Sequence, residues 1–168
     1  TIVYSGRTTT TTNTNTNQSK SSTVDADGLT LTATDDGGTI TYVYNSFGNP
    51  ISITGPSGTP IKSTYDDYGR QTELDDPAAG PMHYEYDALG QLLQQTDNAG
   101  NTYNMTYDLL GRTTEKTGPE GTYTYTYDVG FLGKPETQTA PNGISTTTHY
   151  DGLGRPETHT EEIDGITY

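Results

Sequence analysis

Three histidines, His83, His149 and His159, are the first candidates for catalytic chemistry in this sequence. A catalytic histidine needs a nucleophile or an orienting carboxylate held beside it. The sequence contains neither a Gly-x-Ser-x-Gly nor a His-Glu-x-x-His element that would supply such a partner. His83 and His149 each fall just before a tyrosine, in different predicted strands. We therefore expect that the protein is not an enzyme and binds no cofactor.

Carboxylates are the second group with metal-binding or acid-base potential. Neighbours such as Asp66-Asp67 and Glu161-Glu162 would face opposite sides of a strand, so most of them are expected to be solvated. The segment Asp25-Ala26-Asp27-Gly28 resembles part of a calcium loop, but it lacks the third oxygen ligand and the distal glutamate. The sequence therefore predicts no metal site.

Tyrosines are the third group, with 14 in the chain. Aromatic rows on a polar sheet could bind sugar rings by stacking, which makes a glycan a candidate partner. A single binding site, however, does not need a tyrosine at a fixed position of every repeat, and this regularity favours a structural role.

Composition excludes several other classes of protein. Only 28% of the 168 residues are hydrophobic, too few for a thick aliphatic core. The net charge of -14 repels phosphates, so we expect no nucleic-acid partner. No run of about 20 apolar residues exists, so no membrane insertion is expected. The absence of cysteine rules out disulfides and thiolate chemistry.

The elements that position these residues follow from an internal repeat. The motif Tyr-Asp-x-x-Gly, often followed by a basic residue, recurs every 21 or 22 residues. Two worn copies precede it, over residues 2–7 and 24–28, which makes eight in all. Val129 and Gly130 enlarge the fifth clear copy. The clear copies comprise Tyr44, Gly48, Tyr65, Asp66, Gly69, Arg70, Tyr86, Asp87, Gly90, Tyr107, Asp108, Gly111, Arg112, Tyr127, Asp128, Gly133, Tyr150, Asp151, Gly154 and Arg155.

A second glycine lies about midway between successive motifs, so each repeat carries two turns. Tetrads such as Asp97-Asn98-Ala99-Gly100 and Asp66-Asp67-Tyr68-Gly69 have the residue preferences of a type I turn closed by a left-handed glycine. Both turns are therefore predicted to join antiparallel hairpins with a glycine bulge. Eight repeats of this kind predict about 16 strands.

The segments between turns alternate with period two. In Thr122-Tyr123-Thr124-Tyr125-Thr126-Tyr127 the tyrosines would share one face of a strand and the threonines the other. Residues 8–23 are rich in Thr and Asn but keep this register. They are interpreted as a degenerate hairpin in which Asn replaces Gly, with a disordered linker as the alternative.

Packing is expected from recurring positions, since aliphatic residues are few. The residue before the first glycine is apolar in six copies, and we expect it to pack on the motif tyrosine in a continuous ridge. The basic residue after that glycine is expected to pair with the motif aspartate and to cover a tyrosine ring, as at Asp66 with Arg70 and Asp108 with Arg112. The aspartate itself should accept hydrogen bonds from turn amides.

The motifs Tyr65–Arg70, Tyr107–Arg112 and Tyr150–Arg155 resemble the YD-repeat, or RHS-repeat, family over essentially the whole chain. In this family, found in secreted bacterial toxins, insecticidal toxin complexes and teneurins, the repeats wind as a β-strip into a hollow shell around a C-terminal cargo domain. The resemblance implies a secreted or cell-surface protein. The self-cleaving aspartyl module that ends such shells is not visible. Asp76-Pro77-Ala78-Ala79-Gly80 shows only a passing likeness to its Asp-Pro-x-Gly element.

These observations predict an all-β protein: one continuous array of hairpin repeats over residues 1–168, truncated at both ends, in a curved or spiralling antiparallel sheet. Residues 1–40 hold degenerate repeats. The expected function is structural, as a segment of a shell whose partners are neighbouring repeats and the cargo domain. The alternative is a carbohydrate- or protein-binding module that uses exposed Tyr and Thr rows. Self-association through unpaired strand edges near Thr1 and Tyr168 is also expected.

Overall fold

A computed structural model describes residues 1–128, 132–163 and 165–167. The enlarged turn predicted around Val129 and Gly130, and the edge at Tyr168, lie outside these residues. The chain divides into two units, Thr1–His83 and Tyr84–Tyr168. Every regular element of the described chain is a β-strand, which confirms the predicted all-β class. None of the described residues belongs to a helix with the length and apolar character to cross a bilayer.

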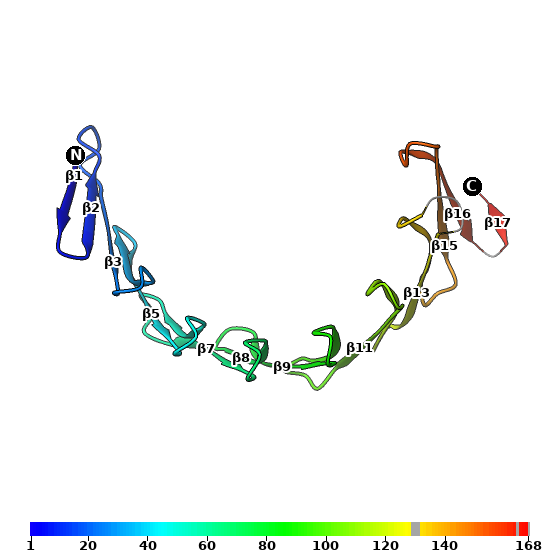
Figure 1. Cartoon of the computed structure of the whole chain (residues 1–168), viewed down its shortest axis with the longest axis horizontal. Helices are drawn as coiled ribbons and strands as arrows, with labels where there is room; N and C mark the ends of the chain where they lie inside the picture. Colours follow the sequence, from blue (N-terminus) through cyan, green and yellow to red (C-terminus); the bar gives the residue numbers. More distant parts are fainter. Residues whose placement is uncertain (129–131, 164, 168) are drawn as a thin grey trace. The chain divides into compact units, whose positions relative to one another are not determined.

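The strands follow the hairpin repeat (Figure 1). The first unit contains β1 Ile2–Ser5, β2 Thr8–Thr12, β3 Ser19–Val24, β4 Thr30–Asp35, β5 Gly38–Tyr44, β6 Pro50–Thr54, β7 Pro60–Tyr65 and β8 Gln71–Asp76. Strand β9, Gly80–Tyr86, spans the boundary between the units. The second unit continues with β10 Leu92–Thr96, β11 Thr102–Tyr107, β12 Thr113–Gly118, β13 Gly121–Tyr127, β14 Pro135–Thr139, β15 Ser145–Tyr150, β16 Pro156–Ile163 and β17 Ile166–Thr167.

Each strand pairs with the next along the chain, so the sheet is a simple antiparallel meander. Hairpins of this kind form locally, because each pairing needs only a short turn. The meander also places the first turns of all the repeats in a unit at one end of the strands and the second turns at the other. The motif residues therefore recur along one side of each unit.

The turn between β11 and β12 shows how the motif closes a hairpin. The N–H of Gly111 donates to the carbonyl of Asp108 at 3.0 Å, and the N–H of Asp108 donates to the carbonyl of Arg112 at 3.0 Å. The register shifts between Thr106 and Tyr107, and Gly111 has a φ of 80°. This is the predicted type I turn with a glycine bulge.

The left-handed conformation recurs at both glycines of the repeats, as predicted, except that the first repeat has no second glycine. Positive φ angles occur at Gly6, Gly28, Gly38, Gly48, Gly58, Gly69, Gly80, Gly90, Gly100, Gly111, Gly121, Gly133, Gly143, Gly154 and Gly165. Three of the second turns are tighter than predicted, because Asp35 pairs directly with Gly38, Gly118 with Gly121 and Ile163 with Ile166.

Residues 8–23 form the predicted hairpin. Strands β2 and β3 pair from Thr8 opposite Thr23 to Thr12 opposite Ser19. Asn17 has a φ of 58° and stands where later repeats have the second glycine. Asn is one of the few side chains that tolerates this conformation, which explains the substitution.

The two faces of the sheet differ in chemistry. In β13, Tyr123, Tyr125 and Tyr127 are half-buried on one face, whereas Thr124 and Thr126 are exposed on the other. Thr124 lies opposite Thr139 across the sheet, and Thr126 lies opposite Thr137. The strand thus has a threonine face and a tyrosine face, as its alternation predicted.

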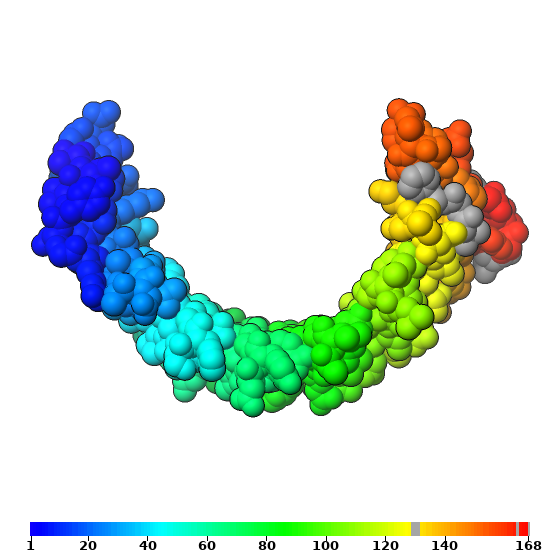
Figure 2. Space-filling view, in the orientation of Figure 1, coloured from blue at the N-terminus to red at the C-terminus, as the bar shows by residue number. Residues whose placement is uncertain are grey.

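The prediction that the residues before the first glycine pack on the motif tyrosines in a continuous ridge is wrong. The six apolar residues before the first glycine are between 72% and 86% exposed; they are Phe47, Tyr68, Leu89, Leu110, Leu132 and Leu153. Five of them, all except Leu132, occupy the second central position of a type I turn, where the side chain projects off the end of the hairpin. No apolar side chain is fully buried in the part of the chain that the structure describes. The hairpins of each unit lie side by side as one layer (Figure 2).

Candidate functional site

The motif aspartate organises its own turn. Asp108 Oδ1 accepts the N–H groups of Leu110 at 2.9 Å and Arg112 at 3.0 Å, as the sequence predicted. The backbone N–H of Arg112, with its side chain, holds the pKa of the Asp108 carboxyl below its usual range against partial desolvation. The same pair of amide hydrogen bonds recurs at Asp25, Asn45, Asp66, Asp87 and Asp151.

The motif tyrosine ties each repeat to the one before it. The hydroxyl of Tyr107 donates to the backbone carbonyl of Leu92 at 2.8 Å, reaching from β11 to the start of β10. The acceptor always lies two residues after the first glycine of the preceding repeat. The same bond joins Tyr44 to Thr30, Tyr65 to Pro50, Tyr127 to Thr113 and Tyr150 to Pro135.

Sequence reasoning left the partners of these hydroxyls open and missed their carbonyl acceptors. The 14- or 15-residue separation of donor and acceptor is visible in the sequence only once the pairing is known. One signal was available: Pro50 and Pro135 occupy the acceptor position. Proline offers a carbonyl but no N–H, so it fits a site that is used only as an acceptor.

Replacing Tyr107 by Phe is expected to lower the free energy of unfolding by about 1 kcal/mol, because one partly buried hydrogen bond is lost and a carbonyl is left without it. Urea unfolding measures the change. The matched control is Tyr103→Phe on the same strand, because the Tyr103 hydroxyl has no hydrogen bond to a described residue. Equal effects of the two changes would contradict the tie between repeats.

The basic residue after the first glycine works between repeats as well as within its turn. Arg112 pairs with Asp108 at 2.6 Å, as predicted, and with Asp128 of the following repeat at 2.6 Å. Its guanidinium lies 4.4 Å from the ring centre of Tyr127. The hydrogen bond to Asp128, then the one to Asp108, raises the pKa of Arg112 above its usual range. The bridge to Asp128 was not predicted.

The predicted contact of basic residues with tyrosine rings is confirmed at other repeats. Arg70 lies 5.1 Å from the ring centre of Tyr68, and Lys134 lies 5.9 Å from that of Tyr150. Arg70 also pairs with Asp66 at 2.7 Å. The motif thus combines a carboxylate, a cation and a ring, and in the second unit the ring comes from the next repeat.

The three histidines lie on exposed parts of the strands, with His83 in the first unit and with His149 and His159 at adjacent register positions of the paired strands β15 and β16. His83 is 3.8 Å from Glu73, and His149 is 3.5 Å from Glu136. His159 shares a 3.1 Å hydrogen bond with Thr148. Glu136 is the one described side chain that is nearly enclosed, at 6% exposure, but His149 beside it is largely open to solvent.

The Asp25–Gly28 segment forms an ordinary motif turn. Asp25 Oδ1 accepts the N–H groups of Asp27 and Leu29, each at 2.9 Å, so this oxygen serves the backbone. No cluster of three or more potential metal ligands occurs in residues 1–128, 132–163 and 165–167.

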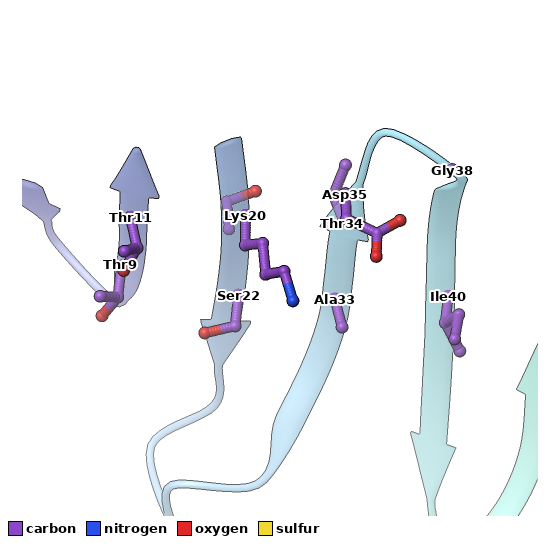
Figure 3. A pocket seen from close by; sticks show the side chains of 10 residues that line it. Thr9, Thr11, Lys20, Ser22, Ala33, Thr34, Asp35, Gly38 and Ile40 are labelled. Carbon is purple, nitrogen blue, oxygen red and sulfur yellow. The ribbon is translucent and has the colours of Figure 1, made fainter. Parts of the chain in front are cut away.

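A shallow hollow of about 290 Å³ lies on the first unit over β2–β5 (Figure 3). Short side chains line it, among them Thr9, Ser22 and Ala33, with Lys20 extending from β3. Ser22 stands at a strand position that Tyr42, Tyr84 and Tyr125 occupy in later repeats, so this part of the hollow reflects missing bulk. Its polar groups do not converge on a point where a ligand would be held.

Comparison with solved structures identifies chains that share this fold. A crystal structure of TcdB2-TccC3 superposes with a TM-score of 0.72 at 15% identity over 96% of this chain and 11% of that chain. A TcdB2-TccC3 structure without the hypervariable C-terminal region gives 0.70 at 15% identity, over 92% and 10%. The Tc holotoxin pore of Photorhabdus luminescens gives 0.65 at 16% identity, over 89% and 9%. The chain thus spans about a tenth of the length of these structures.

No curated protein matches the sequence. The RHS Repeat family model matches four overlapping stretches, residues 24–60, 44–81, 65–102 and 86–123. Together they extend over more than half of the chain, and each one begins at the tyrosine position of a motif. The Tyr-Asp-x-x-Gly turns and the tyrosine ties described above are what this repeat builds. The chain belongs to the RHS repeat family.

Proposed function

We propose that this chain is a structural segment of an RHS-type β-shell, which encloses a cargo or toxin polypeptide of a secreted or surface protein, and that it has no catalytic role. The observation that carries this proposal is the tyrosine tie. The hydroxyls of five motif tyrosines donate hydrogen bonds to backbone carbonyls of the preceding repeat. Their role is thus to hold neighbouring strands of successive repeats together, as a wall requires.

The electrostatics of the motif support the same role. Arg112 offsets one of the two negative charges of Asp108 and Asp128, and the hydrogen bonds of these three residues hold the turns of two successive repeats together. Groups that are occupied in this way are not available to a substrate. The likeness to Tc toxin structures adds a fold-level argument that such strips occur in toxin assemblies.

The alternative, a glycan- or protein-binding module that uses Tyr and Thr rows, is less favoured. Many threonine hydroxyls pair with each other across the strands, as in Thr106 with Thr114 at 2.9 Å and Thr117 with Thr122 at 3.0 Å. The motif tyrosines are likewise engaged through their hydroxyls. The hydroxyls of these five tyrosines and of the paired threonines are therefore already used within the sheet.

The test uses the whole polypeptide that the gene encodes. We expect further Tyr-Asp-x-x-Gly repeats beside residues 1–168 and a segment that resists protease until the repeat wall is weakened. Gly111→Val should weaken the wall and expose that segment, whereas Gly152→Val, at a glycine without positive φ, should not. A gene without further repeats, or a remainder digested equally in both variants, would overturn the shell.

A further inference from the structure

A second hollow in the first unit lies beside the turns that follow β3 and β5. Its volume is about 660 Å³, and its lining includes Asp25, Asp27, Leu29, Tyr42, Tyr44 and Phe47. The rings of Tyr42 and Tyr44 are stacked with their centres 6.4 Å apart. Carboxylates and aromatic faces therefore meet in one depression at a motif turn.

The second unit shows what the repeat places at the equivalent point. There Arg112 follows the first glycine, binds the motif aspartate and the next repeat's Asp128, and lies 4.4 Å from the ring centre of Tyr127. Tyr127 is itself held by its hydroxyl on Thr113. Tyr44 has the same anchorage on Thr30, so the two rings are equivalent by position.

The residue after the first glycine is basic in five copies and amidic in two, Asn49 and Gln91, whereas this site has leucine. Leu29 follows Gly28, and its Cδ1 atom would lie 3.6 Å from a Cβ added at Gly48, so the side chain leans on the next turn. Leucine reaches less far than arginine and carries no charge. The space for a guanidinium between Asp25 and Tyr44 is left as part of the hollow.

Asp25 has lost the partner that the repeat normally supplies. Its Oδ1 atom accepts two backbone N–H groups, as in the other copies. In the copy at Asp108, the second carboxylate oxygen accepts the Nε–H of Arg112 at 2.7 Å. Among the described residues no cation pairs with Asp25, and Asp27 adds a second carboxylate to the same rim.

We propose that this hollow binds the side chain of an arginine supplied by a cationic partner polypeptide. The guanidinium would bond Asp25 and lie on the Tyr44 ring, as Arg112 does in the second unit. Arginine fits better than lysine because its planar fork binds a carboxylate and stacks on a ring at once. This proposal does not depend on the shell proposed above. It adds a partner chemistry, an arginine side chain, for one site on the chain.

Charge argues for a separate partner and against a second copy of this chain. The chain has 22 acidic and 8 basic residues, so two copies repel each other. Three of the four arginines, Arg70, Arg112 and Arg155, are already paired with their own aspartates, which leaves Arg7 alone without an ion pair among the described residues. A basic polypeptide is attracted by the same net charge that disfavours self-association at this site.

The test measures binding of a hexa-arginine peptide to the chain by calorimetry and by amide chemical shifts, at about 0.15 M salt to screen the overall charge. Leu29→Arg should fill the hollow from within and weaken binding at least about fivefold. Its matched control is Leu109→Arg, which adds the same charge at a fully exposed turn position. A melting curve of each variant checks that it is folded.

A second pair of variants removes charge instead. Asp25→Asn keeps the turn acceptor, as Asn45 does in the next repeat, and should also weaken binding at least about fivefold. Asp36→Asn removes an equal charge at the other end of the strands and should have little effect. Shifts centred on the amides of Asp25, Leu29 and Tyr44 support the site. Equal losses in both pairs, or shifts spread over the chain, would mean general attraction and would overturn it.

Discussion

Gly111→Val is expected to lower the free energy of unfolding by about 2 kcal/mol, because the valine must adopt a backbone conformation that β-branched residues resist. Gly111 has a φ of 80°, and its N–H closes the turn on Asp108. A Cβ at this position would also approach Gln91 Nε2 at 3.1 Å. Since that atom ends a flexible side chain, backbone strain and not the contact is the main cause.

Gly152→Val provides the control for this prediction. Gly152 lies in the equivalent turn of a later repeat, but its φ is not positive and nothing lies within 4 Å of an added Cβ. It should therefore tolerate valine with little loss. Urea unfolding compares the two variants with the parent chain. A Gly111 variant as stable as the Gly152 variant would show that the left-handed turn is not what stabilises the hairpin.

The turns were predictable because their determinants are local in sequence. The glycine bulge at Gly111 follows from the residue preferences of one tetrad, and the amide hydrogen bonds of Asp108 follow from the short reach of an aspartate side chain. The pairing of Asp108 with Arg112 is also local, since the two residues close one turn. Repetition of the tetrad made each of these inferences stronger than one copy would allow.

The tyrosine ties were not predictable for the opposite reason. Tyr107 and its acceptor on Leu92 are 15 residues apart and meet only when strands β10 and β11 pair. The direction in which a tyrosine side chain crosses the sheet depends on strand twist and rotamer, which the alternating pattern does not specify. The acceptor is a backbone carbonyl, and every residue has one. The residue type at the acceptor position therefore gives almost no indication that its carbonyl accepts a tyrosine hydrogen bond.

Leu110 shows why an apolar residue at a regular position does not always mark a core. Its recurrence suggested a core, and hydrophobic residues usually are buried. In a type I turn that closes a hairpin, however, the second central side chain projects away from the sheet, and Leu110 is 72% exposed. The predicted type I turn therefore already implied that this side chain is exposed. The turn explains why this position is exposed, and among the described residues of either unit nothing buries these side chains.

Arg112→Met is expected to lower the melting temperature at neutral pH at least about twice as much as Arg155→Met does. Arg112 is 22% exposed and holds two carboxylates, Asp108 and Asp128, each at 2.6 Å. Its loss leaves two half-buried negative charges beside each other. Arg155 is 72% exposed and pairs with Asp151. The two variants change the net charge equally, so the difference between them reports the local bridge.

Acid should abolish the loss of melting temperature caused by Arg112→Met. The direction of this pH dependence follows from the pKa shifts of the two aspartates. The Arg112 side chain lowers the pKa of Asp128, and the Arg112 N–H together with its side chain lowers that of Asp108. A carboxyl with a lowered folded pKa stabilises the fold above the unfolded value of about 3.9. That stabilisation is lost as the pH falls through the folded pKa values. Melting temperatures measured from pH 7 downward should therefore converge for the parent and the Arg112 variant. A gap that persists at the acid end would mean that Arg112 acts mainly by packing on Tyr127.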